Sequence, residues 1–106
     1  MQNNIIKEIK KAIKEGADVN IQDDYGWTAL MQASKRGYFE IAELLLEAGA
    51  DRNIKDKWGI TALMIAIHRQ KKIAKLLLDA SDYAKKDYEI MQIDCGKIIE
   101  LLTPKN

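Results

Sequence analysis

Two side chains could do chemistry by type, His68 and Cys95, each the one residue of its kind in the chain. A structural zinc needs four such ligands and a catalytic zinc three, and a cysteine nucleophile needs a base beside it. Neither residue has a local cluster of partners, the acidic residues are spread without a marked pair, and there is no glycine-rich phosphate loop. The sequence therefore predicts no enzyme, no metal site and no cofactor. We expect His68 to be solvated at a helix end, and Cys95 to be a small buried side chain.

The composition indicates one soluble domain. The 106 residues suffice for a single domain, and 47% hydrophobic with 31% charged residues is a globular balance. There is no apolar run near the roughly 20 residues of a membrane span. The N-terminal stretch lacks the apolar core of a secretory signal, so we expect a cytoplasmic location. A net charge of +1 gives no general attraction to nucleic acid or anionic membranes, and neither is expected as a partner.

One motif occurs twice. "DYGWTALMQAS" begins at Asp24 and "DKWGITALMIAI" begins at Asp56, with equivalent positions 33 residues apart. Thr28 and Thr61 stand where a helix would begin in each copy. A threonine hydroxyl there can accept from the free N–H groups of the first turn, which contributes about 1 kcal/mol.

The residues that follow complete a repeating unit. Gly37 favours the left-handed turn that ends a helix, and a second helix is predicted over about 38–48. The polar stretch 50–59 is expected to be an extended finger with a tight turn. Such a unit cannot bury its apolar face alone, whereas stacked copies can, which is the logic of a solenoid.

These motifs resemble the ankyrin repeat family. Its frame Asp-x-x-Gly-x-Thr-Pro-Leu-His-x-Ala-Ala is matched by "DDYGWTALMQAS" from Asp23 and by "DKWGITALMIAI" from Asp56. Its Gly-Ala-Asp-Val-Asn appears as "GADVN" at 16–20 and as "GADRN" at 49–53. The resemblance implies an all-α solenoid of stacked helix-turn-helix units with short β-hairpin fingers.

The second copy departs from the frame at its turn. Gln70 stands where the first copy has glycine, one residue is missing, and the offset falls to 32. We therefore expect a tighter or altered turn there. Ser81 replaces the glycine that would close the following helix, so that helix is expected to run on or to end differently.

The boundaries follow from the repeats. We expect a single ankyrin-repeat domain over 1–106, with a half repeat or cap over 1–22, a repeat over 23–55, a repeat with a shortened turn over 56–82, and a degenerate cap of two helices over 83–106. The first segment supplies only a second-helix equivalent, with Ile9 and Ile13 on one face and lysines elsewhere. It is either a polar cap or the cut edge of a longer array.

The resemblance also implies a binding site, because partners of such repeats dock on the concave face of fingers and first helices. The positions that match are Asp24, Tyr25, Trp27, Lys35, Arg36, Lys57, Trp58, Ile60, His68 and Arg69. Aromatic and arginine side chains are common interface hot spots. Alternatively, Tyr25 and Trp58 stack on each other and only stiffen the fingers.

The expected function is protein–protein interaction through this face, as a scaffold or binding module that is monomeric unless it belongs to a longer array. Two alternatives stay open: a structural fragment of a longer ankyrin array, and a regulatory or inhibitory subunit of an enzyme. The lysine-rich first helix could also lie on an anionic membrane or nucleic acid, but we expect a solvated cap instead.

Overall fold

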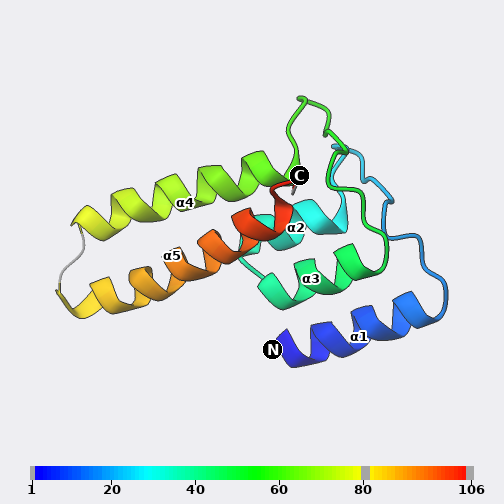
Figure 1. Ribbon diagram of the computed structural model, residues 1–106, viewed down its shortest axis with the longest axis horizontal. Coiled ribbons are helices and arrows are strands. Elements are labelled where there is room, and N and C mark those ends of the chain that lie inside the picture. Colours follow the sequence, from blue (N-terminus) through cyan, green and yellow to red (C-terminus); the bar gives the residue numbers. More distant parts are fainter. Residues whose placement is uncertain (1, 80–81, 105–106) are drawn as a thin grey trace.

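The computed structural model describes residues 2–79 and 82–104, and it is built of helices and loops. The prediction of an all-α fold is confirmed. Figure 1 shows the helices lying side by side, with the loop from α1 to α2 and the loop from α3 to α4 at the same end. In chain order the helices are α1 (Gln2–Lys14), α2 (Ala29–Arg36), α3 (Phe39–Glu47), α4 (Ala62–Asp79) and α5 (Asp82–Leu102).

The two predicted helix starts are confirmed. Thr28 Oγ1 accepts from the Met31 N–H at 3.3 Å, and Thr61 Oγ1 accepts from the Met64 N–H at 3.4 Å. Gly37 ends α2 in the left-handed region, with φ of 74°. The chain then reverses into α3, so the first copy folds as the helix-turn-helix unit that its sequence predicts.

The second copy folds differently, and the predicted shortened turn at Gln70 is wrong. Residues 62–79 form one continuous helix, α4, which passes through Gln70 without interruption. Glutamine is a good helix former that disfavours the left-handed conformation, whereas glycine adopts it freely. The stretch 71–79 therefore continues along the axis of α4 instead of turning back. Ser81, where an altered helix end was expected, lies outside the described residues.

The C-terminal segment is also simpler than expected. Instead of two helices, residues 82–102 form the single helix α5, which contains Gly96 without breaking. Helices α4 and α5 lie side by side and antiparallel, and their far ends project beyond the other helices (Figure 1).

The last turns of α5 complete the core. Ile98 and Leu102, each 1% exposed, join the cluster formed by Ile41 and Leu45 of α3 and by α2. The "CGKIIELL" stretch of α5 thus lies where a second helix of the next layer would pack.

At the other end of the stack, α1 packs on α3 through a narrow apolar stripe. Ile6 is buried, and Ile9 packs against the core. Lys7, Lys10 and Lys11 are exposed, which is the amphipathic pattern expected of an end helix.

The fingers differ from the expected β-hairpins, because the described residues include no strand. They are tight turns, and the Lys57 N–H donates to the Tyr25 carbonyl at 2.9 Å where the two fingers meet.

Candidate partner-binding surface

Each finger is folded around an aspartate that opens the repeated motif. Asp23 Oδ1 accepts from the N–H groups of Tyr25 and Trp27, at 2.9 and 2.8 Å. In the next copy, Asp56 Oδ1 accepts from the N–H groups of Trp58 and Ile60, at 2.8 Å each. An aspartate side chain that accepts from the N–H groups of following residues mimics a backbone turn. This explains why an aspartate stands at the start of each finger.

Asp56 also joins the two copies. Its second oxygen, Oδ2, accepts from the indole Nε1 of Trp27 at 2.9 Å, and the residue is only 8% exposed. Burial would by itself raise the pKa of this carboxyl, but the donors Ile60, Trp58 and Trp27 stabilise the ionised form and lower the net pKa below its ordinary value. Both oxygens of the Asp56 carboxylate therefore accept hydrogen bonds, one from its own finger and the other from Trp27.

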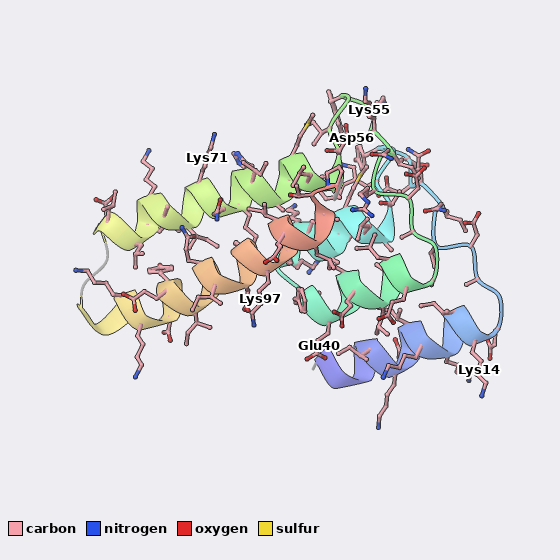
Figure 2. The ribbon with its side chains drawn as sticks, in the orientation of Figure 1. Lys14, Glu40, Lys55, Asp56, Lys71 and Lys97 are labelled. Carbon is pink, nitrogen blue, oxygen red and sulfur yellow. The ribbon has the colours of Figure 1, made fainter. Side chains whose placement is uncertain are left out.

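The backbones of the fingers approach closely. Gln22 Nε2 donates to the Gly26 carbonyl at 2.9 Å and to the Lys55 carbonyl of the next finger at 3.1 Å. A Cβ on Gly26 would lie 2.9 Å from the Lys57 nitrogen and 3.0 Å from the Asp56 Cα. Figure 2 shows Lys55 and Asp56 in the loop at the finger end of the stack.

Tyr25 and Trp58 lie side by side on these fingers, as their equivalence predicted. Their ring centroids are 6.1 Å apart with an interplanar angle of 17°, which is a stacked arrangement. The stack is nevertheless open to solvent, because Tyr25 is 60% exposed and Trp58 64%. The two rings are therefore exposed to solvent, and they also stack on each other as in the alternative interpretation.

A groove lies beside the fingers, between α2, α4 and α5, with a volume of about 690 Å³. Five predicted site residues line it: Trp27, Lys35, Ile60, His68 and Arg69. The other lining residues come from α4 and α5: Met64, Ile65, Lys72, Ile73, Leu76 and Met91. The remaining predicted residues, Asp24, Tyr25, Arg36, Lys57 and Trp58, are exposed but do not line it.

Three groove residues, Met64, Lys72 and Leu76, are exposed and were missed at the sequence level. Met64 is part of the repeated motif but was not among the predicted site residues. Lys72 and Leu76 follow the turn that was expected at Gln70, so they were not predicted to lie on the same face as His68. The signal that could have found them is the four-residue spacing from Met64 through His68 and Lys72 to Leu76, which marks one ridge of an uninterrupted helix.

Two of the predicted site residues, Arg69 and Lys35, contact other side chains around the groove. Arg69 Nη1 donates to Sγ of Cys95 in α5, and its guanidinium covers Gly37, where an added Cβ would lie 2.7 Å from Cζ. Arg69 thus links α4 to α5 and to the turn after α2. Lys35 places its amino group 5.5 Å from the centre of the Trp27 ring, within cation–π range.

Cys95 and His68, the two residues considered for chemistry, differ in their exposure to solvent. Cys95 is 1% exposed, and burial raises the pKa of its thiol, with Arg69 offsetting part of this rise. This agrees with its predicted burial. His68 is solvent-exposed as predicted, but it lies within α4 rather than at a helix end. Across residues 2–79 and 82–104 there is no cluster of three or more His, Cys, Asp or Glu suited to a metal ion.

The stacked helical units and their paired fingers define a helical repeat solenoid. A family model for ankyrin repeats in three copies matches residues 1–89, and the chain belongs to the ankyrin repeat family. Ankyrin repeats are generally non-enzymatic modules for protein–protein interaction. A search of curated proteins finds no match. Within the part of the chain that the structure describes, no helix has the length and apolarity to cross a membrane.

Proposed function

We propose that this chain is a cytoplasmic, monomeric binding module that takes a partner protein on its concave surface. This surface consists of the finger residues Tyr25, Trp58 and Ile60 and the groove between α2, α4 and α5. The observation that carries the proposal is the groove itself, which gathers five of the ten predicted residues around a volume of about 690 Å³. A regulatory or inhibitory subunit of an enzyme would use the same surface.

The exposed apolar area supports this use. Tyr25, Trp58 and Met64 are each more than half exposed, although aromatic rings and methionine are usually buried. Tyr25 and Trp58 stack on each other, and Met64 lines the groove together with basic side chains. Exposed apolar side chains beside charged ones are typical of a protein interaction site. The hydrogen bonds of the fingers fix the backbone that carries Tyr25 and Trp58, so less conformational entropy is lost there on binding.

The test is capture of a partner from a lysate of the native source, with identification by mass spectrometry. The variant carries Tyr25→Ala, Trp58→Ala and Ile60→Ala, and its fold is checked by circular dichroism. The matched control carries Ile90→Ala and Ile93→Ala, which are exposed apolar residues of α5 outside the groove.

We expect a protein that is captured by the wild type and the control and is lost by the finger variant. Loss with the control and retention with the finger variant would place the site on α5 and contradict the proposal. Equal capture by all three proteins would contradict it as well.

A further inference from the structure

We propose that the occupant of this groove is an acidic amphipathic helix of the partner protein. The inference rests on the proposed function and adds the chemistry of the partner. It is carried by three properties of the groove: the sign of its charges, the placement of its apolar side chains, and its length along α4.

The charges that line the groove are basic. Lys35, Arg69 and Lys72 are cations that line the groove together with His68, and no aspartate or glutamate of the described residues is among the lining side chains. The Asp56 carboxylate accepts from the indole of Trp27 but does not itself line the groove. The protein as a whole carries a net charge of only +1. The basic character is therefore local to the groove, and it favours a partner segment with carboxylates at its rim.

The apolar side chains of the groove are accessible. Met64 is 51% exposed, Leu76 43% and Ile60 36%, and Ile73 forms part of the wall beneath them. A segment with only acidic residues would leave this apolar surface in water. A segment with one apolar face and one acidic face would cover the apolar side chains and meet the cations at its edges.

The length of the groove fits a helix. Met64, His68, Lys72 and Leu76 recur every four residues and form one ridge on α4. From Met64 to Leu76 the helix axis rises about 18 Å, which is the length of about three to four turns of a partner helix. The ridge exists because α4 continues through Gln70, and Met91 of α5 also lines the groove.

The chain offers matched controls on the same helix. Leu78 is 85% exposed, yet unlike Leu76 it does not line the groove. Lys71 and Lys72 are both exposed, and only Lys72 lines the groove. Figure 2 shows Lys71 pointing outward from α4, away from α5. Leu76→Glu is therefore paired with Leu78→Glu, and Lys72→Glu with Lys71→Glu.

The experiment selects peptides of about 16 residues, enough for four helical turns, from a random displayed library on the full chain. Counter-selection uses the folded Leu76→Glu variant. The best binders are then measured by fluorescence anisotropy. We expect enriched peptides with Asp or Glu and with apolar residues at helical spacing. Their affinity should fall about tenfold or more with Leu76→Glu or Lys72→Glu and by less than about twofold with the paired controls. It should also fall as salt rises.

Other results would overturn the inference. These are no enrichment over the counter-selected variant, enrichment of basic or non-amphipathic peptides, or equal sensitivity to Lys71→Glu and Lys72→Glu. Dimerisation in analytical ultracentrifugation that Leu76→Glu abolishes would make the occupant a second copy of this chain. Binding to phosphatidylserine vesicles that Lys72→Glu abolishes, with no peptide enriched, would make it a membrane surface.

The two proposals fail separately. A lysate partner that needs the finger residues but binds the Leu76→Glu and Lys72→Glu variants normally would leave the proposed function standing and remove only this inference. If neither the lysate nor the library yields a ligand of the concave surface, both proposals fail.

Discussion

The contact between the fingers can be tested with one pair of glycines. Gly26 and Gly59 are equivalent positions in the two copies, and both have positive φ, 81° and 79°. A Cβ on Gly26 would lie 2.9 Å from the Lys57 nitrogen and 3.0 Å from the Asp56 Cα, whereas a Cβ on Gly59 would meet nothing within 4 Å. Alanine therefore strains the backbone at both positions and disturbs packing only at the first.

The expected magnitudes follow from these contacts. An L-residue in the left-handed region costs about 1–2 kcal/mol, so Gly59→Ala should destabilise the fold by about that amount. Gly26→Ala adds a backbone clash that must push the fingers apart. This removes the bond from the Lys57 N–H to the Tyr25 carbonyl and the bond from Gln22 to the Lys55 carbonyl. At about 0.5–1.5 kcal/mol for each bond, Gly26→Ala should destabilise by about 1–3 kcal/mol more than Gly59→Ala.

The measurement is urea unfolding followed by circular dichroism at 222 nm, for the wild type and both variants. Thermal melts should show the same order, because 1 kcal/mol corresponds to roughly 4–8 °C in a domain of about this size. Equal destabilisation by the two variants would show that the finger contact contributes no net stability. A larger effect of Gly59→Ala would refute the description of the fingers.

Three further predictions concern single side chains. Because the pKa of Asp56 is lower in the folded state, the wild type should lose stability as the pH falls through this folded-state pKa. Asp56→Asn should therefore weaken the dependence of melting temperature on pH between about 2 and 6. An unchanged pH dependence would contradict the assigned hydrogen bonds. Cys95 should react with Ellman's reagent at pH 8 far more slowly in the native protein than in urea, because its thiol is buried with a raised pKa, and equal rates would contradict the burial. Gln70→Gly should destabilise by about 1 kcal/mol, because glycine is unfavourable inside a helix; greater stability in urea would show that a turn is preferred there.

The parts of the fold that the sequence predicted are those set by local chemistry. Thr28 and Thr61 cap their helices by contacts three residues away, and Gly37 ends α2 through its own φ. The placement of Tyr25 beside Trp58 needed only the equivalence of two copies. Each of these features depends on a few neighbouring residues and the repeat period.

The missed parts depend on competition between segments. The stretch 71–79 repeats the apolar pattern of α3, and this pattern is the same whether the helix turns back or continues. The deciding fact is that residues 95–102 of α5 pack against α3 instead. Periodicity within a segment cannot show which of two similar segments occupies a shared place in the core.

The residues of the candidate site also differ in how far the sequence could predict their contacts. The finger residues were predictable, because each belongs to a copy of the motif. Arg69 was predicted on the binding face like its equivalent Arg36; it lines the groove and also contacts Gly37 and Cys95, which the sequence did not indicate. Arg36 has no glycine turn of a preceding unit to cover, since α1 is the only helix before α2 among the described residues.

The break in the repeat therefore has a consequence for binding. In the first copy, Gly37 ends α2, so that helix contributes only its short length to the concave surface. In the second copy, Gln70 lets α4 continue and carries Lys72, Ile73 and Leu76 onto the same surface. This is possible because the end of α5 supplies the core residues that 71–79 would otherwise provide. The residue that interrupts the repeat pattern thus also extends the groove on which both proposals rest.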